Sequence, residues 1–518
     1  MAASRVAAGI LVSRLLGLVR ERVFAHFFGN GALASAWRAA LKIPNIIQNL
    51  LGEGSLSASF IPVYVRLLEE GREEEAGRVA GAVLGLLAAV AGTLALLGTL
   101  AAPWIAGVVL WGWEGGDPAR ATTVSLLRIL FPMTGVLVLS AWLLGILNSH
   151  RRFFVSYVAP AVWNAAMITV LVAWGWWRGL GQEDLLLALG WGALAGGLLQ
   201  ILVQLPFALP YLGGLKISLD RTLADVREVV RNFLPVAAAR GAVNLSGLFD
   251  LFLASFLLDN AIATMGYAQT LYVLPVSLFG MSIAAAELPE LSRDEAEGLE
   301  AVRNRAENAI VGVTFWMLPS ALGYVLFGEE VVAAIFRTGA FGANDAVVGG
   351  WVLAAYALGL PASGVSRVLS SSFYALRDTR TPASIAYARI LVSAGVGAAL
   401  MFPFDRILIG NLGFGAAGLA LGASVGAWLE WALLRRSLRR RLQGLGPFRP
   451  RVAPMILAVA VAAGIGLGLQ RLLPATYPLL RAVLVVGPFG VAYLALTHLM
   501  GVSRFRLPRN GGPGQDVL

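Results

Sequence analysis

Long apolar stretches make up most of this chain, and short charged connections separate them. A helix needs about 20 mostly apolar residues to cross a bilayer, and about fourteen stretches approach or exceed that length. They cover residues 5–28, 33–65, 79–111, 121–148, 154–177, 184–212, 228–257, 261–289, 306–327, 345–375, 382–403, 411–434, 452–473 and 477–500. The pattern predicts an all-α integral membrane protein with about fourteen transmembrane helices. Prolines inside these stretches predict kinks, which membrane helices tolerate; they include Pro44, Pro132, Pro275 and Pro361.

Basic residues are concentrated in alternate connections. The connections after even-numbered stretches hold most of the arginines, including the run from Arg435 to Arg441. The connections after odd-numbered stretches hold mainly Arg120, Arg178, Arg337, Arg406 and Arg471. Cytoplasmic loops of membrane proteins carry an excess of Lys and Arg, so we expect the even connections and both termini to be cytoplasmic.

The two halves of the chain align with each other at an offset of roughly 229 residues. Pro132 falls on Pro361, Arg151 falls on Arg380, and Ala34-Ser35 falls against Ala263-Thr264. Each half holds six stretches, so the copies cross the membrane in the same direction, as in transporters whose substrate sits between two parallel repeats. The predicted domains are an N-terminal six-helix lobe (1–215), a C-terminal six-helix lobe (222–441), two extra helices (452–502) and a cytoplasmic tail (503–518).

Composition narrows the function classes. Residues are 58% hydrophobic and only 14% charged, which excludes a large soluble enzyme. The chain has no Cys and three scattered His, so we expect no metal site and no cofactor. In a soluble protein the net charge of +10 would suggest a nucleic acid partner, but membrane topology accounts for these arginines and we expect none.

One predicted helix carries a polar stripe. Its members follow each other at i, i+4, i+7 and i+11, and they are Arg38, Lys42, Asn45 and Asn49. Ionisable groups inside a membrane are costly and usually line a water-filled cavity, so we expect this stripe to face one. Glu53 follows between Gly52 and Gly54, where the two glycines predict a bend or a close backbone approach.

Further ionisable or amide residues lie inside other stretches. They are Arg14, Arg20, Glu21 and Arg22 in the first, Arg240, Asn244 and Asp250 in the seventh, and Arg389 in the eleventh. Simpler interpretations stay open for some of them. Arg20 and Arg22 could snorkel from a helix end, Glu21 could pair with a neighbouring arginine, and Arg240 and Asp250 could form a structural pair. Arg367 is compatible with a snorkelling or a cavity position.

An excess of positive charge in a low-dielectric wall favours an anionic substrate, and arginine forks match phosphate oxygens. A cationic drug would be repelled. The chain has no Gly-x-x-x-x-Gly-Lys-Ser/Thr loop, so ATP is not the visible energy source.

Several segments resemble the MurJ (MviN) family along almost the whole chain. They are Ser13–Glu21, Lys42–Asn45, Gly52–Ser57 with Phe60–Pro62, Gly145–Asn148, Arg152-Phe153, Asn164, Phe336–Phe341, Phe373–Pro382 and Gly415–Leu421. The resemblance implies an inner-membrane flippase with 14 helices, of the multidrug/oligosaccharidyl-lipid/polysaccharide (MOP) exporter superfamily. The implied substrate is lipid II, the undecaprenyl-pyrophosphate-linked peptidoglycan precursor, carried by alternating access through a cationic central cavity.

The family's charged residues match this chain only in part. Arg14, Arg20, Glu21, Lys42, Asn45 and Glu53 coincide with family residues. Family arginines fall at Gln48 or Asn49 and at Thr270, and a family acidic residue falls at Ser35. The sodium site of some members uses acidic and amide groups on the eleventh helix, where this chain has Arg389. We therefore expect Arg389 to pair with Asp250 as a fixed counter-ion, with transport independent of sodium.

The sequence thus predicts a non-enzymatic, monomeric flippase for a lipid-linked cell-wall precursor. Its predicted cavity residues are Arg14, Arg20, Glu21, Arg38, Lys42, Asn45, Asn49, Glu53, Arg240 and Asn244, and its partners are the pyrophosphate head group and membrane lipids. The alternatives are a flippase for O-antigen or capsule precursors, a small-molecule cation antiporter, and a scaffold without transport. An embedded enzyme is disfavoured because no His, Cys or paired-carboxylate group occurs in one place.

Overall fold

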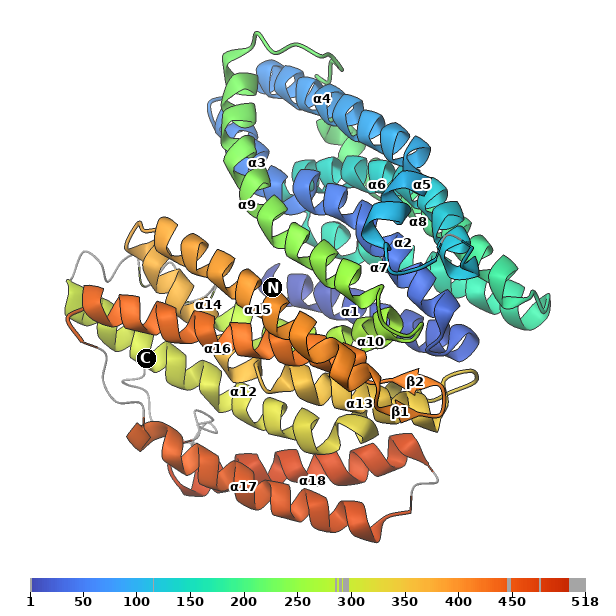
Figure 1. The fold of residues 1–518 in the computed structure, drawn as a ribbon. Helices are drawn as coiled ribbons and strands as arrows, with labels where there is room; N and C mark the ends of the chain where they lie inside the picture. The colour runs from blue at the N-terminus through green and yellow to red at the C-terminus, as the bar shows by residue number, and fades with distance from the viewer. Residues whose placement is uncertain are drawn as a thin grey trace. The chain divides into compact units, whose positions relative to one another are not determined.

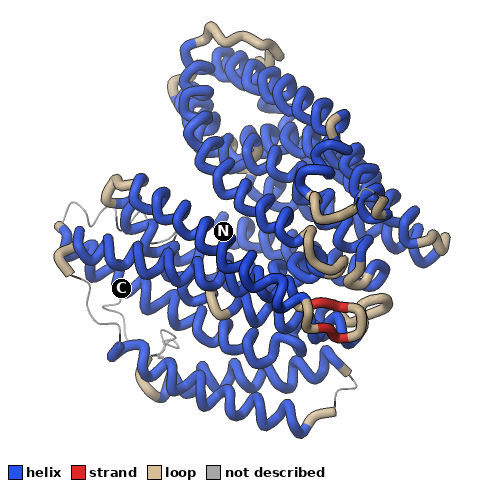
Figure 2. The backbone as a smooth tube through the Cα atoms, viewed as in Figure 1, coloured by secondary structure: helices blue, strands red, loops and turns tan. Residues whose placement is uncertain are grey.

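The computed structural model describes residues 2–114, 116–284, 287, 291, 298–444, 449–474 and 477–502. Helices account for nearly all of this part of the chain (Figures 1 and 2). In chain order they are α1 (Ala2–Phe28), α2 (Ala32–Leu51), α3 (Glu53–Glu69), α4 (Glu73–Leu100), α5 (Ala102–Val109), α6 (Pro118–Ser149), α7 (Phe153–Val170), η1 (Leu171–Trp177), α8 (Gln182–Ala208), η2 (Leu209–Tyr211), α9 (Ala224–Ala254), α10 (Ala261–Pro275), η3 (Val276–Met281), α12 (Leu299–Phe336), α13 (Ala343–Ala357), α14 (Leu360–Ala375), α15 (Arg380–Asp405), α16 (Gly415–Arg441), α17 (Arg449–Leu472) and α18 (Pro478–Leu499). A two-stranded antiparallel hairpin, β1 (Leu408–Ile409) and β2 (Leu412–Gly413), turns at Gly410, whose φ of 60° suits a glycine.

Within the described residues, 11 helical segments are long and apolar enough to cross a membrane. This confirms the predicted all-α membrane class. The long helices α1, α2 and α9 are not among them, so the total of fourteen spans stays a prediction. These three helices carry most of the charged candidates from the sequence, and they lie together in one part of the molecule.

Two predicted interruptions are confirmed. The second stretch is two helices, since α2 ends at Leu51 and α3 begins at Glu53, with Gly52 between them. The tenth stretch is likewise split, because α13 ends at Ala357 and Pro361 lies in the first turn of α14. Proline fits a first helical turn because the amide hydrogen that it lacks has no intrahelical partner there.

The chain folds into two compact units. Unit 1 contains Met1–Gly266 with the short segments Phe336–Asp345 and Asp405–Ala416, and unit 2 contains the rest. Helix α9 belongs to unit 1, where it packs on α2 and α3. Asp250 therefore lies in unit 1 and Arg389 in unit 2. The lobes proposed from the repeat, 1–215 and 222–441, stay a prediction.

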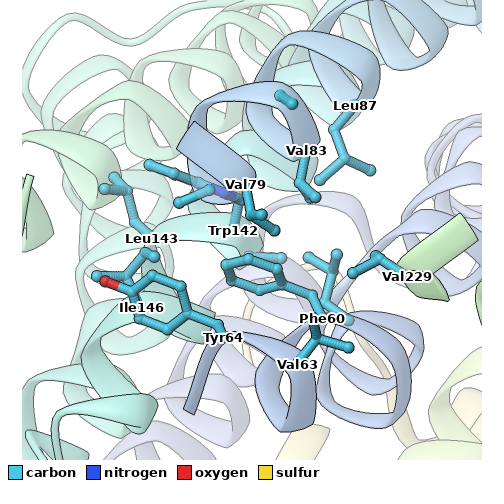
Figure 3. Close-up of a cluster of buried hydrophobic side chains, with 14 of the residues drawn as sticks. Phe60, Val63, Tyr64, Val79, Val83, Leu87, Trp142, Leu143, Ile146 and Val229 are labelled. Atoms are coloured by element: carbon cyan, nitrogen blue, oxygen red, sulfur yellow. The ribbon is translucent and has the colours of Figure 1, made fainter. Parts of the chain in front are cut away.

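The core of unit 1 forms where α3, α4 and α6 meet the start of α9 (Figure 3). Phe60, Tyr64 and Trp142 each expose 2% or less of their surface there, and Val229 closes the cluster from α9. Burying a large apolar side chain contributes about 1.5–3 kcal/mol, so this cluster fixes α9 against the N-terminal helices.

The linker from η2 to α9 crosses α4 in a groove of glycines. Gly77, Gly81 and Gly85 share one face of α4, and a Cβ on each would lie 2.4, 2.1 and 2.1 Å from the carbonyl oxygens of residues 214, 216 and 218. Contact at every second linker residue is the period of an extended chain. Only glycine leaves room for this backbone, so these three positions determine where the linker runs before α9 begins.

Segments that the internal repeat aligns meet in unit 1, near the starts of α2 and α10. The backbone amide of Ala263 donates to Ser35 Oγ at 3.0 Å, and Asn30 Nδ2 donates to Thr264 Oγ1 at 2.8 Å. Equivalent segments of two copies approach each other where a two-fold axis passes between them. These contacts support the parallel repeat.

In unit 2, α12 packs on α14 and α16 around a second buried cluster. The α17–α18 hairpin adds a third cluster beside α12, in which Tyr493 Oη donates to the carbonyl oxygen of Phe315 at 2.7 Å. The two C-terminal helices therefore pack onto unit 2 through α12.

Candidate functional site

The polar stripe of α2 is one side of an amphipathic helix in unit 1. The opposite side is buried in the bundle through Ala36, Ala40 and Ile43. Arg38 and Lys42 are half-buried, and Asn49 at the far end is exposed. The 3.6-residue period of the helix therefore turns all four stripe residues toward α1, α9 and the space beside them.

Glu21 of α1 joins two arginines. It is 4% exposed, and its two carboxylate oxygens form short ion pairs with Arg20 and Arg38. Arg20 also donates to Asn164 Oδ1 of α7 at 3.0 Å. The two guanidinium groups lie over aromatic rings, Arg20 over Trp163 at 5.3 Å and Arg38 over Phe24 at 5.6 Å. Glu21 is thus the buried hub of a network that links α1, α2 and α7.

The network confirms the simple interpretation that Glu21 pairs with a neighbouring arginine. It also shows that Arg20 does not snorkel to a helix end, because its carboxylate and amide partners lie inside the bundle. Arg14 and Arg22 are exposed on α1.

Lys42 lies against α9. Its Cε is 3.2 Å from the position of a Cβ on Gly247, and the charge of Asp250 acts on its ammonium group. A side chain at position 247 would displace the lysine, so this glycine makes room for it. Asp250 and Lys42 have opposite charges and together add no net charge to unit 1.

Farther along α2, the stripe is joined to α9 by amides. Asn49 Nδ2 donates to Asn244 Oδ1 at 2.9 Å, and Asn244 Nδ2 donates to the carbonyl oxygen of Arg240 at 2.8 Å. The guanidinium of Arg240 fills the space over Gly54, where a Cβ would lie 1.8 Å from Nη2, and its charge acts on Glu53. The close approach predicted for Gly52-Glu53-Gly54 is therefore confirmed.

A cavity of about 410 Å³ opens beside these groups, within unit 1. Its polar wall comes from three of the predicted residues, Asn49, Glu53 and Arg240, and from Gln48, Ser57 and Gln200. Leu137, Ala141, Leu144 and Pro160 supply its apolar wall. A few convergent polar groups on an apolar wall are the usual form of a ligand-binding pocket.

The structure brings most of the predicted residues into three sets of contacts along α2, around Glu21, around Lys42 and around Arg240. Asn164, Ser57 and Gln200 were not predicted as members. Asn164 was part of the family resemblance, but a single amide in an apolar helix carries no spacing signal. Ser57 and Gln200 resemble the small and polar residues that pack helices together in membranes.

The predicted pair of Asp250 and Arg389 is divided between the two units and stays a prediction. Within unit 2, Arg389 Nη1 donates to Glu430 Oε2 of α16 at 2.6 Å. Glu430 could not be recognised from the sequence, because one carboxylate before a basic helix end resembles a solvated residue. No group of three His, Asp or Glu in the described part of the chain could hold a metal ion.

Solved transporters share this fold. A structure titled "Lipid II flippase MurJ, inward closed conformation" matches with a TM-score of 0.74 at 20% identity, covering 96% of this chain and 99% of that one. An inward-facing multidrug resistance MATE transporter of the MOP superfamily matches with a TM-score of 0.68 at 17% identity, covering 86% of this chain and 98% of that one. The fold and its apolar helices define a multi-pass membrane protein with the architecture of the MOP transporters.

Sequence comparison identifies the family. The family model described as "Lipid II flippase MurJ" matches residues 24–492. The probable lipid II flippase MurJ of Bdellovibrio bacteriovorus is 31% identical over 520 residues, covering 98% of this chain and 96% of that protein. The one from Rhizobium meliloti is 31% identical over 465 residues, covering 88% and 84%. This chain belongs to the MurJ family.

Proposed function

We propose that this chain translocates lipid II across the cytoplasmic membrane. The match to MurJ proteins along nearly the whole chain carries this proposal. The charged network of unit 1 also supports the proposal. It lies on α1 and α2, whose ionisable residues would be costly in a bilayer unless they face a polar substrate. No covalent step is required: the barrier is the cost of moving a charged, hydroxyl-rich head group through hydrocarbon.

The balance of charge in unit 1 favours an anion. The candidate residues supply five cations, Arg14, Arg20, Arg38, Lys42 and Arg240, and three carboxylates, Glu21, Glu53 and Asp250. Glu21 alone has two arginine partners, so that cluster keeps a positive charge. A pyrophosphate can use this excess, since arginine donates to two phosphate oxygens at once.

In this account the protein works by alternating access, with the head group in a cationic cavity and the prenyl tail in lipid. Both termini lie in the cytoplasm, as the arginine-rich connections predict. The protein acts as a monomer and contacts only its lipid-linked substrate and the surrounding lipids.

A second candidate is the flipping of another polyprenyl-linked oligosaccharide, such as an O-antigen or capsule precursor. A family arginine falls at Gln48 or Asn49, and both of these residues line the 410 Å³ cavity, so its wall has an amide there in place of a charge. This substitution changes the cavity wall and allows a different glycan beside the same pyrophosphate.

Complementation separates the two candidates. A strain depleted of its own lipid II flippase should grow when it expresses this chain, and should not grow with the empty vector. Immunoblotting of membranes establishes expression. Absence of growth at normal membrane levels would reject lipid II as the substrate and favour another glycan.

The matched variants are Arg38→Gln and Arg303→Gln. Arg38 pairs with buried Glu21, whereas Arg303 pairs with exposed Glu300 in the first turns of α12. We expect growth to fail with Arg38→Gln and to persist with Arg303→Gln. Equal growth with both variants would remove the unit 1 network from the transport mechanism.

A further inference from the structure

Helix α14 of unit 2 is buried except along one side. Residues 362–366, 368–369 and 371–373 are all buried, whereas Arg367 and Tyr374 are exposed and Ser370 is half-buried. These three accessible residues follow at i, i+3 and i+7, which places them on one helix face. Ser363, one turn before Arg367, continues that face into the protein.

This face is polar throughout. A helix face in contact with lipid tails carries apolar side chains, because polar groups there lack hydrogen-bond partners. Ser363, Arg367, Ser370 and Tyr374 instead repeat the spacing of the α2 stripe, i, i+4, i+7 and i+11. The accessible face of α14 therefore has the pattern of a surface in contact with water.

Among the residues that the structure describes, Arg367 has no carboxylate partner, unlike its charged neighbour Arg389. Arg389 of α15 is held by Glu430 at 2.6 Å. Arg367 lies within electrostatic range of both but, among the described residues, makes no hydrogen bond or ion pair of its own. Two arginines and one glutamate leave a net positive charge among these three residues, and Arg367 is an exposed residue.

The surroundings hold Arg367 in place. A Cβ on Gly280 of η3 would lie 3.5 Å from Cα of Gly364 and 3.8 Å from Cδ of Arg367, so the two helices approach closely beside the stem of the arginine. One turn earlier, Tyr272 Oη of α10 donates to Ser363 Oγ at 3.0 Å. Arg367 is thus exposed as a residue although its stem lies beside η3, a π-helical segment of the kind often found at functional sites.

We propose that the accessible face of α14 is an anion-binding surface of unit 2, in which Arg367 binds a phosphate-type group. Its ligand is the pyrophosphate of the transported lipid, a statement that rests on the proposed function. The guanidinium donates to phosphate oxygens, and Ser370 and Tyr374 offer hydroxyl donors along the same face. Glu430 neutralises Arg389 and leaves Arg367 as the charge available to the ligand.

Site-resolved arginine modification tests the binding surface directly. The purified full chain in detergent is treated with phenylglyoxal, and peptide mass spectrometry follows the modification of Arg367 and Arg303. Inorganic pyrophosphate is the probe, with sodium chloride at equal ionic strength as the control. We expect pyrophosphate to slow the modification of Arg367 by about fivefold or more. The rate of modification of Arg303 should not change. Equal rates at Arg367 with pyrophosphate and with chloride would overturn the proposal.

Lipid binding and transport then identify the source of the phosphate. Arg367→Gln should weaken lipid II binding by about tenfold to a hundredfold, the effect of losing a hydrogen bond to a charged group. Arg303→Gln should bind as wild type does, and Arg367→Lys should recover part of the loss because it keeps the charge without the planar fork. Protection by phosphatidylglycerol vesicles but not by lipid II would overturn the assignment to the transported lipid.

The two proposals can fail separately. A wild-type chain that does not flip lipid II, but whose Arg367 is still protected by pyrophosphate, loses the proposed function and keeps the anion-binding surface. A wild-type chain that flips lipid II while Arg367→Gln binds and transports at the same rate keeps the function and loses this surface. Retention volume on size-exclusion chromatography shows that the variants compared are folded.

Discussion

The polar faces of α2 and α14 have the same residue spacing, but their basic residues differ in whether a carboxylate lies beside them. On α2 of unit 1, Arg38 shares buried Glu21 with Arg20, and Lys42 lies in the field of Asp250. On α14 of unit 2, Arg367 has no carboxylate of its own among the described residues, because Glu430 is bound to Arg389. The spacing of a polar stripe thus indicates which helix face meets water, but the residues on neighbouring helices decide how much charge is left for a ligand.

The difference has a physical basis. A buried charge without a partner costs several kcal/mol, so the half-buried cations of α2 need carboxylates to be tolerated at all. Arg367 is accessible to water, so a partner is not required for its stability. In unit 1 the arginines are therefore held by the carboxylate of Glu21. In unit 2, Arg367 is an exposed cation whose stem lies against neighbouring helices.

The largest expected effect comes from breaking the network of unit 1. Glu21→Gln leaves the Arg20 and Arg38 guanidinium groups near each other without their carboxylate, which should lower the free energy of unfolding by about 3–5 kcal/mol. Thermal unfolding in detergent measures this loss. Glu300→Gln, which removes an exposed partner of Arg303, should cost at most about 1 kcal/mol. Similar losses for both variants would contradict the role of Glu21 as a buried hub.

A second prediction concerns the position of α9, on which the Lys42 and Asn49 contacts depend. Gly81→Leu places a side chain where a Cβ alone would be 2.1 Å from the Lys216 carbonyl oxygen, so the linker before α9 must move. Overpacking of this kind costs about 1–3 kcal/mol. Gly92→Leu is the control on the same helix, since no atom lies within 4 Å of its Cβ position. If both variants unfold at the same temperature, the glycine groove does not hold the linker.

Removing the carboxylate of unit 2 should have a smaller effect than removing that of unit 1. Glu430→Gln takes the partner from Arg389, whose side chain is 36% exposed and can be solvated by water. We expect a loss of about 1–2 kcal/mol, with pyrophosphate protection of Arg367 unchanged or stronger because one negative charge is gone. A loss as large as that of Glu21→Gln would remove the contrast between the two units.

The smallest expected effect lies outside both stripes, at the start of α15. Asp378 accepts from the amides of Arg380 and Thr381 at 3.1 and 3.0 Å, and these hydrogen bonds, with Arg441 nearby, lower the pKa of its carboxyl. The lowered pKa means that the stabilisation is fully present above the ordinary value of 3.8 and is lost as the pH falls through the folded-state value. Asp378→Ala should cost about 1 kcal/mol at pH 7 and little at pH 2–3, and unfolding at both pH values checks this.

The sequence predicted the features that depend on local pattern. The length of the apolar stretches located the helices, and the two glycines around Glu53 located the break between α2 and α3. The four-residue polar stripe identified the polar face of α2. These features follow from the chain within one or two turns, so no tertiary contact is needed to recognise them.

Features that depend on long-range contacts could not be predicted in this way. The place of α9 in unit 1 depends on the packing of Val229 against α3, α4 and α6, and the pairing of Arg389 with Glu430 spans 41 residues. On α14 the sequence left a cavity position open for Arg367 alone, and the rest of its accessible face was not predicted because its serines resemble the small residues that allow close helix packing. This face is recognised in the structure, where its residues are accessible and the rest of the helix is buried.

Lipid II transport by this chain can be measured in a defined membrane. The purified chain is reconstituted into liposomes that hold fluorescent lipid II, and the movement of the head group between leaflets is followed with an impermeant quencher. We predict translocation well above that of protein-free liposomes, its loss in Arg38→Gln, and wild-type rates in Arg303→Gln. If lipid II moves no faster with the folded chain than in protein-free liposomes, this chain does not translocate lipid II.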